Sequence, residues 1–257
     1  MIRFNSPIKN FAYFCYRWIA PVIDPIKLLR SIPNYFGFFA DWLRYKSLDG
    51  AERVKLSDLW PNIHDKTSTT PFLRHYFYQD VWAARNIAQT GVVSHVDVAS
   101  RIDFVGFLTS VTHVTFIDIR PLEADLPNFT GKAGSILAMP FADGEIASLS
   151  CLHVAEHIGL GRYGDPLDPQ GTIKACKELA RVLVPGGRLY FSTPIGAPRL
   201  CFNAHRIHSV DMILEYFSDL TLVRLDGIDD ANRYHDNIDR SLLDGANYAC
   251  GLFIFTK

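Results

Sequence analysis

Three ionisable side chains follow directly after a short apolar segment. Residues Ile146–Leu152 read IASLSCL without a helical period, and His153, Glu156 and His157 come within the next five residues. Such an apolar run is typical of a strand that is buried on both faces of a parallel sheet. In open α/β sheets, ligands bind outside the carboxyl ends of the strands. The sequence therefore predicts the active site at this strand end, beside the glycine-rich loop that runs on to Pro166.

The same residues spell HxxEH, a zinc motif in which two histidines one helical turn apart hold the metal and the glutamate acts as base. That motif requires one helix through all five positions. The preceding segment is strand-like, and Gly159, Gly161 and Gly164 would end a helix early. We therefore assign no metal ligand from the sequence and keep a zinc hydrolase as the remote alternative.

Strands and helices alternate from residue 91 onward. Repeated strand-helix units form a mostly parallel sheet with helices on both faces. The predicted strands are Val92–Val98, Val111–Ile119, a short one near Gly134–Ala138, Ile146–Leu152 and Arg188–Ser192, and the predicted helices cover 102–109 and 170–183. We therefore expect an α/β, Rossmann-like fold.

The carboxyl-terminal part departs from this alternation. Leu220–Leu225 and Gly251–Thr256 are strand-like without a strong helix between them, so we expect them to pair antiparallel at the sheet edge. Asp226–Asp244 is rich in Asp, Asn and Arg and is expected to be a solvated loop.

The first 46 residues are dense in aromatic side chains, and their basic residues outnumber the acidic ones seven to two. One helical face is predicted from Phe11, Phe14, Cys15, Trp18 and Ile19. We expect the prolines of this segment to break it into short helices, at Pro21, Pro25 and Pro33. The segment is interpreted as a cap over the core, an oligomer interface or a peripheral membrane contact.

We divide the chain into a helical N-terminal extension, residues 1–66, and a Rossmann-like domain, residues 67–257, which opens with a helix at 74–89. The 26 basic and 27 acidic residues give no electrostatic indication of nucleic-acid binding. The five cysteines show no metal-like spacing, which favours a reduced, cytosolic protein. We find no secretory signal and no membrane-spanning run, so we expect a cytoplasmic protein with a peripheral contact at the inner face of the membrane.

The order of these elements resembles the class I S-adenosylmethionine-dependent methyltransferases. The resemblance covers residues 91–194 and includes Asp97, Asp118, the turn MPFADG and the late segment VLVPGGRLYFSTP. Within that superfamily, HVAEHIGLGRYGDP together with CFNAHR at 201–206 resembles a bacterial subfamily that is often associated with cell-surface polysaccharide synthesis.

The resemblance implies S-adenosylmethionine as cofactor, with Asp118 on its ribose hydroxyls. Ala99, Arg101 and Asp103 stand where the family has three glycines, and Ser135 stands near the position of an acidic residue that reads the adenine. The implied cofactor-binding residues are Asp97, Ala99, Ser100, Arg101, Asp118, Ile119, Met139 and Leu152.

Methyl transfer to an oxygen requires a group that removes the acceptor's proton, and histidine titrates in the useful range. His153 is the first candidate for this base and His205 the second. Asn203, His205 and Arg206 have an alternative role as caps of a helix near Ser209. The expected substrate-binding residues are Glu156, Arg162, Tyr163, Asp165, Asn203 and Arg206.

The leading hypothesis is a methyltransferase that O-methylates a cell-surface glycan or its nucleotide-linked precursor. The alternative is a catalytically divergent module of the same fold, which binds sugar nucleotides or scaffolds glycan assembly. Replacement of the glycines in the first loop favours this alternative.

Overall fold

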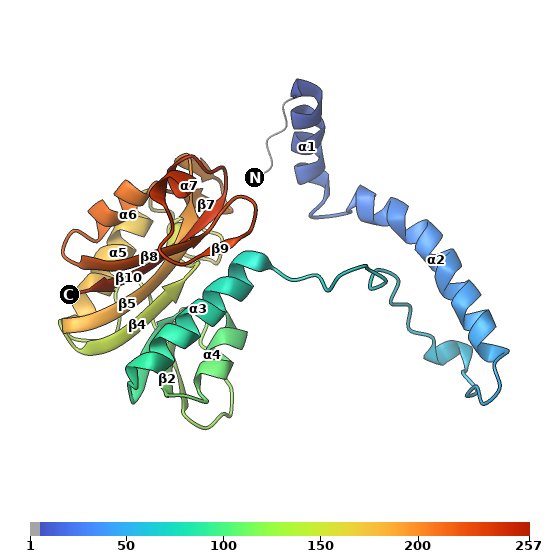
Figure 1. Cartoon of the computed structure of the whole chain (residues 1–257), viewed down its shortest axis with the longest axis horizontal. Coiled ribbons are helices and arrows are strands. Elements are labelled where there is room, and N and C mark those ends of the chain that lie inside the picture. Colours follow the sequence, from blue (N-terminus) through green and yellow to red (C-terminus); the bar gives the residue numbers. More distant parts are fainter. Residues whose placement is uncertain (1–5) are drawn as a thin grey trace. The chain divides into compact units, whose positions relative to one another are not determined.

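The structure is a computed structural model that describes residues 6–257, and the chain divides into two compact units, Met1–Phe72 and Leu73–Lys257 (Figure 1). The first unit contains helix α1, Pro7–Ile19, helix α2, Pro25–Lys46, and a 3₁₀ turn at Leu56–Asp58. Within the described residues, no helix has both the length and the apolar character that crossing a bilayer requires.

Helix α2 begins at a cap formed by Asp24, whose carboxylate accepts hydrogen bonds from the backbone N–H groups of Ile26 and Lys27. Pro25 occupies the first helical position, where a missing N–H costs nothing. The predicted break at Pro33 is wrong, because this proline lies inside α2. A proline inside a helix removes one backbone hydrogen bond and can bend the helix without ending it. Helix α2 continues on both sides of Pro33.

The second unit is built on an eight-stranded sheet in the order β3-β2-β1-β4-β5-β10-β8-β9. Its strands are β1 Ser94–Val98, β2 His113–Asp118, β3 Phe129–Ala133, β4 Ile146–Leu152, β5 Leu183–Ile195, β8 Thr221–Ile228, β9 Tyr234–His235 and β10 Ala249–Thr256. Strands β1 to β5 pair parallel, and β10 pairs antiparallel with both β5 and β8, which confirms the predicted arrangement. The strand order reverses between β1 and β4, where sheets of this type open a crevice.

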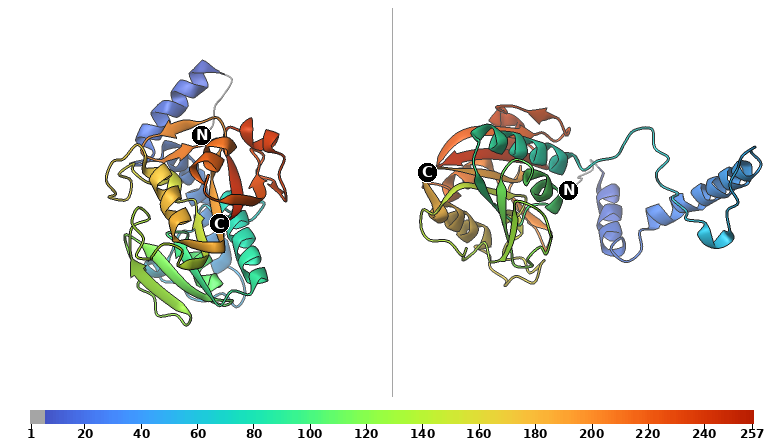
Figure 2. Two further views of the ribbon diagram at one scale, coloured as in Figure 1. Left: turned by 90° about the vertical axis from the view of Figure 1, so that its left-hand side faces the viewer. Right: turned by 90° about the horizontal axis from the view of Figure 1, so that it is seen from below.

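Helices cover both faces of the sheet, and Figure 2 shows α3 and α5 on opposite sides of it. The helices of this unit are α3 Arg74–Thr90, α4 Ile102–Leu108, α5 Gly171–Val182, α6 Val210–Tyr216 and α7 Arg240–Asp244, with a 3₁₀ turn at Ala155–His157 and a hairpin of β6 Arg199–Cys201 and β7 His205–Ile207. Side chains alternate along β10: Phe253 and Phe255 pack in the core of α5 and α6, while Cys250, Leu252 and Ile254 pack in the core of α3 and α4.

Two long-range hydrogen bonds fix α3 on the sheet. The Trp82 indole donates to Asp226 at 2.7 Å, and the Ser192 hydroxyl donates to Gln79 at 2.7 Å. The predicted solvated loop at Asp226–Asp244 is wrong, because Asp226 is fully buried and the segment contains the end of β8, β9 and α7. Arg224 and Trp82 satisfy the Asp226 carboxylate, so its burial is tolerated.

The predicted third strand is displaced. The strand is β3, Phe129–Ala133, and Gly134 already belongs to the turn that follows. A Cβ atom at position 134 would lie 2.8 Å from Ile117 Cγ2. The backbone therefore approaches β2 so closely here that only glycine fits without a shift. Strand β3 lies at the sheet edge and is partly exposed, which leaves little apolar pattern in its sequence.

Candidate active site

A cavity of about 540 Å³ lies at the carboxyl ends of β1, β2 and β4. Its lining comes from four segments: Val98–Ala99, Ile117–Arg120, Gly134–Leu137 and a discontinuous set between His153 and Pro166. The volume falls in the range of small-molecule and cofactor sites, about 300–1,000 Å³. The strand end predicted from Ile146–Leu152 therefore borders this cavity.

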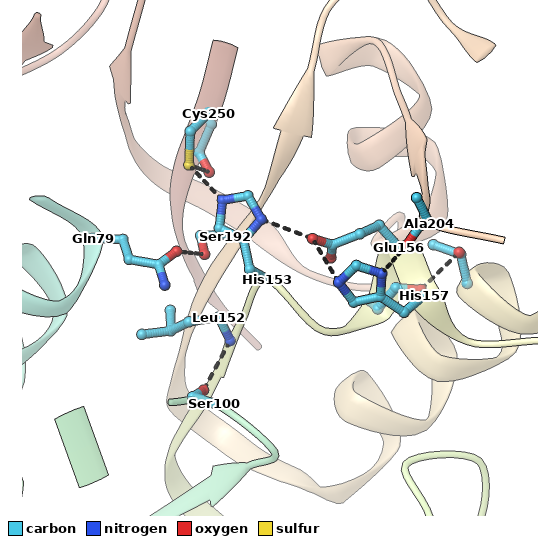
Figure 3. Close-up of polar contacts among 12 residues, drawn as sticks. Gln79, Ser100, Leu152, His153, Glu156, His157, Ser192, Ala204 and Cys250 are labelled. Atoms are coloured by element: carbon cyan, nitrogen blue, oxygen red, sulfur yellow. Dashed lines mark hydrogen bonds and ion pairs between the residues drawn. The ribbon is translucent and has the colours of Figure 1, made fainter. Parts of the chain in front are cut away.

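The loop after β1 has a left-handed residue where glycine is usual. Ala99 lies at φ 53° and lines the cavity, and its N–H donates to the Ile117 carbonyl at 2.9 Å. Asp97 is fully buried, accepts from Ser100 N–H at 3.0 Å and accepts from the Ser150 hydroxyl. The Ser100 hydroxyl accepts from Leu152 N–H at 3.0 Å (Figure 3). Asp97, Ser100 and Leu152 thus shape the loop from below and do not line the cavity.

Burial raises the pKa of Asp97 to about 7, even though the Ser150 and Ser100 hydrogen bonds favour the carboxylate. Ser150 also contacts His95 Nε2 at 2.8 Å, and Ser148 contacts His95 Nδ1 at 2.8 Å. Burial lowers the pKa of His95 to about 3, so this histidine is neutral. A buried polar network therefore joins β1 to β4 beneath the cavity.

The two bulky residues at the other glycine positions do not line the cavity. Arg101 and Asp103 form an ion pair with each other at 2.6 Å, and the Arg101 guanidinium lies 5.2 Å from the ring centre of Tyr76. Arg101 was expected to contact the cofactor, and the structure instead places it in this surface cluster. The charged side chains of this loop therefore do not occupy the cavity.

The end of β2 supplies a carboxylate to the cavity. Asp118 lines it together with Ile119; the Asp118 side chain is 13% exposed and accepts from Arg120 N–H at 2.7 Å. Ser135 also lines the cavity, and its hydroxyl accepts from Leu137 N–H at 3.1 Å. Met139 does not line it, because this side chain is buried in the core of α5 and α6.

At the end of β4, His153 also adopts a left-handed backbone, with φ 55°, and lines the cavity. Its Nδ1 lies 2.8 Å from Glu156 Oε1, and its Nε2 lies 3.3 Å from Cys250 Sγ (Figure 3). Burial opposes charge on His153, but the neighbouring Cys250 sulfur and Glu156 carboxylate raise its pKa well above the usual value. Burial likewise opposes charge on Glu156, and His153 still holds the pKa of that carboxyl below its usual value.

His157 Nε2 lies 3.7 Å from Glu156 Oε1, the oxygen that also contacts His153 (Figure 3). Its Nδ1–H donates to the Ala204 carbonyl at 2.6 Å, and burial lowers its pKa. The helix that the HxxEH zinc motif needs does not form, because the only helical residues there are the 3₁₀ turn Ala155–His157. The two histidines of the motif therefore do not converge on one metal position.

The glycine-rich loop is pinned to the β6–β7 hairpin. Arg162 donates to the Ala204 carbonyl at 2.9 Å and Arg206 donates to the Ile158 carbonyl at 2.6 Å. The predicted capping role of Asn203, His205 and Arg206 is wrong, because the Ser209 hydroxyl caps α6. Expected substrate ligands Glu156, Arg162, Asn203 and Arg206 do not line the cavity, whereas Tyr163 and Asp165 do.

Two guanidinium groups lie close to the Tyr163 ring. Arg120 is 4.8 Å and Arg162 5.0 Å from its ring centre. Asp165 accepts from Gly159 N–H at 2.6 Å, and hydrogen bonds of this kind lower its pKa against the opposing effect of burial. The loop therefore brings an aromatic ring and a carboxylate to the cavity, and the segment after β2 adds the Arg120 guanidinium.

His205, the second predicted base, does not line the cavity, and its ring packs at an angle against two neighbouring rings. Its ring centre lies 6.4 Å from that of His157 and 5.2 Å from that of Tyr248. Burial lowers the pKa of His205 to about 4, so the ring is neutral at pH 7. Its Nε2 is buried and has no hydrogen-bond partner among residues 6–257.

Several residues near His153 were not predicted from the sequence. His75 stacks 6.0 Å from His153 and 5.3 Å from Tyr248, and Cys250 contacts His153 directly. Asp80 lies on the same helix as His75, and burial raises its pKa to about 6. These residues come from α3 and β10 and share no local motif with the β4 end, so no signal in the sequence joins them.

The family model described as "Caenorhabditis protein of unknown function, DUF268" matches residues 93–221. No curated protein matches the chain. The crystal structure of a "putative sarcosine dimethylglycine methyltransferase" from Galdieria sulphuraria is 16% identical, covers 70% of this chain and 86% of that chain, and has a TM-score of 0.51. The complex of N-methyltransferase NodS from Bradyrhizobium japonicum WM9 with S-adenosyl-l-homocysteine is 15% identical over 86% and 98% of the two chains, with a TM-score of 0.48.

At this identity, the likeness to the Galdieria protein shows a shared fold, and it confirms the Rossmann-like architecture expected from the sequence. The match to the family model extends from the start of β1 to the start of β8 and so includes every strand end that borders the cavity. It spans half of the chain, and the chain therefore belongs to the family described as Caenorhabditis protein of unknown function, DUF268.

Proposed function

We propose that this protein is an S-adenosylmethionine-dependent methyltransferase. The observation that carries the proposal is the cavity at the ends of β1 and β2, which Asp118 and the left-handed Ala99 both face. The sheet order places this cavity beside the reversal between β1 and β4, where such folds bind their ligands.

The residues present fit the cofactor. Asp118 offers a carboxylate that lines the cavity, and its partners among the described residues, the Arg120 N–H and guanidinium, both contact Oδ1. Ala99 has the backbone conformation that the family's glycine supplies, and the side chain it adds is one methyl group. Ser135 would meet the adenine with a hydroxyl in place of a carboxylate. Asp118, Ala99 and Ser135 are thus the residues that would hold the cofactor.

When bound, S-adenosylmethionine supplies a methyl group on a positively charged sulfur. This chain must orient the acceptor and take up its proton. We assign the proton to His205 Nε2, because the ring is neutral at pH 7 and this buried nitrogen has no hydrogen-bond partner among the described residues. Both ring nitrogens of His153 already have partners, so His153 is better suited to positioning.

The acceptor we propose is a hydroxyl of a cell-surface glycan or its nucleotide-linked precursor. Tyr163 offers an aromatic face of the kind on which sugar rings pack, and the guanidinium groups of Arg120 and Arg162 lie against that ring. Guanidinium groups bind phosphate in two-point contacts, which suits a sugar diphosphate. The sequence resemblance to a polysaccharide-linked subfamily supports the same acceptor class.

Calorimetric titration with S-adenosylhomocysteine tests the cofactor proposal. We expect saturable one-to-one binding that Ala99→Gly retains and Ala99→Leu abolishes, because leucine would project into the cavity from a left-handed position. Transfer of labelled methyl groups to a panel of nucleotide sugars, compared with amine acceptors, tests the acceptor. Absence of saturable binding by the wild-type protein would refute the enzyme and leave the sugar-nucleotide-binding or scaffolding module.

We also propose that residues 6–46 contact an anionic membrane surface. Large apolar side chains of α1 and α2 are exposed, among them Phe11, Trp18 and Phe36 at 69%, 74% and 74%. Within these residues, six basic side chains accompany two acidic ones, a balance that favours anionic lipid. The full-length wild type should float with anionic vesicles, whereas the double variant Trp18→Ser/Phe36→Ser should remain in the bottom fraction. Equal flotation of both proteins would refute the contact.

A further inference from the structure

We propose that His75, His153 and Cys250 form a binding site for one zinc ion. The three residues come from the first turn of α3, the end of β4 and the start of β10. Their ligand atoms, two imidazole nitrogens and one sulfur, all lie within 4.8 Å of one another. This set differs from the HxxEH set of the sequence and shares only His153 with it.

His153 is oriented as a metal ligand. Metal-bound histidines usually donate the N–H of their second ring nitrogen to a carboxylate, which fixes the tautomer and the ring plane. Glu156 is fully buried and accepts this hydrogen bond from Nδ1 at 2.8 Å, so Nε2 is the nitrogen left for a metal. Nε2 faces the Cys250 sulfur at 3.3 Å (Figure 3).

These separations are close to those of a tetrahedral zinc site. Zn–S distances of about 2.3 Å and Zn–N distances of about 2.0–2.1 Å place sulfur and nitrogen ligands roughly 3.5 Å apart. The Cys250–His153 contact already matches this separation. The widest pair must close by about 1.3 Å, from the 4.8 Å limit of the cluster to that edge length.

His75 is the ligand that can make this adjustment. It is half-buried at the second residue of α3, and its ring stacks at 5.3 Å on Tyr248 and at 6.0 Å on His153. Among the described residues, neither ring nitrogen of His75 makes a hydrogen bond, so both are available to a metal. The helix itself is fixed on the sheet through Gln79 and Trp82, so only the His75 side chain needs to turn.

The donor set selects the metal. Two imidazoles and one thiolate favour zinc and other borderline or soft ions over magnesium and calcium, which prefer oxygen ligands. Three protein ligands leave a fourth position open, as in catalytic zinc sites. Because His153 also lines the cavity, the metal site adjoins the cavity through this residue. A role in binding the acceptor hydroxyl rests on the proposed function, whereas zinc binding itself does not.

Cobalt and zinc titration of the tag-free, full-length protein tests the site. We expect one equivalent of Co²⁺ to bind with an intense near-ultraviolet sulfur-to-metal band and tetrahedral visible bands, and one equivalent of Zn²⁺ to displace it. Cys250→Ser should remove the sulfur band, and His75→Ala should weaken zinc binding by more than tenfold. Glu156→Gln should weaken it by about 10–100-fold, as loss of an orienting carboxylate does elsewhere.

Matched controls use a cysteine and a histidine outside the cluster. Cys15→Ser and His113→Ala should leave the sulfur band and the zinc affinity unchanged. Cobalt binding without a sulfur band, or zinc affinity that His75→Ala leaves unchanged, would overturn the site. His75 is half-buried in the first helical turn, so its variant decides the question even where Cys250→Ser fails to fold.

Titration with S-adenosylhomocysteine before and after zinc loading separates this inference from the proposed function. Cofactor binding by a protein that takes up no zinc overturns the metal site alone. Stoichiometric zinc in a protein that binds no cofactor supports the metal site and refutes only the methyltransferase.

Discussion

Replacement of Asp118 by asparagine is the sharpest test of the cofactor proposal. Asp118 ends β2, lines the cavity and has a side chain that is 13% exposed. Its Oδ1 accepts the N–H of Arg120 at 2.7 Å, which leaves the second carboxylate oxygen for a ligand. Asparagine keeps the volume and one acceptor oxygen, so it preserves the turn to Arg120, and it removes the negative charge that faces the cavity and pairs with the Arg120 guanidinium at 3.7 Å.

The expected loss follows from this arrangement. A hydrogen bond to a charged acceptor contributes about 1.5–3 kcal/mol. Because Oδ1 of Asp118 already accepts the Arg120 N–H, only Oδ2 is left to accept a hydrogen bond from the ligand. Asp118→Asn should therefore cost ligand binding about one such hydrogen bond. Since about 1.4 kcal/mol is a factor of ten in affinity, the dissociation constant for S-adenosylhomocysteine should rise about 10–100-fold.

Isothermal titration calorimetry measures this change, and thermal unfolding of the same samples checks the fold. Asp125→Asn, an exposed change in the loop after β2, is the matched control and should bind as the wild type does. An affinity of Asp118→Asn within twofold of the wild type, in a protein with unchanged unfolding temperature, would show that Asp118 does not contact the ligand.

Three further predictions address the base, the loop and the buried network. His205→Ala should lower kcat for methyl transfer at least tenfold while S-adenosylhomocysteine binding stays the same, because Nε2 is assigned to the proton and not to the cofactor; an unchanged kcat refutes the assignment. Gly159→Ala should lower the free energy of unfolding by more than about 2 kcal/mol, since the residue lies at φ +82° and the new Cβ would be 2.0 Å from the Asp168 carbonyl oxygen; urea denaturation measures it. His95 has a pKa of about 3 when folded and 6.5 when unfolded, so the unfolded chain binds more protons and stability falls as pH drops below 6.5, by up to about 1.4 kcal/mol per pH unit. Urea denaturation at pH 6.5 and 5 should show this loss in the wild type and a smaller one in His95→Gln, and equal losses would contradict the shifted pKa.

The parts of the fold with a buried, local pattern were predictable from the sequence. Strand β4 has the predicted bounds, Ile146–Leu152, because six of its seven residues are buried and leave an apolar run. Strand β3 was missed because it lies exposed at the edge, where apolar residues are not required. Asp226 was assigned to a solvated loop because its partner Trp82 stands 144 residues away, and no local pattern reveals such a pair.

The candidate site divides in the same way. Ala99, Asp118, Ile119, His153, Tyr163 and Asp165 were chosen from strand ends and a following loop, and all six line the cavity. Residues that reach the site across the sheet could not be chosen, because Cys250 is 97 positions from His153 and belongs to a strand with no polar motif. The order of strands in the sheet brings these residues together, and a local sequence pattern does not reveal that order.

The replacement of the first loop glycine by Ala99 is explained by how the two strand ends are held. Ala99 and His153 are both left-handed, at φ 53° and 55°, and both line the cavity. A non-glycine residue in this conformation costs about 1–2 kcal/mol and persists only where its surroundings fix it.

For these two residues the surroundings are visible. Ala99 N–H is bound to Ile117, and the neighbouring Ser100 hydroxyl accepts from Leu152, which ties the β1 loop to the end of β4. His153 is fixed by Glu156 and Cys250. The turn that glycine normally permits is therefore imposed here by hydrogen bonds, so the lost motif does not imply a lost site.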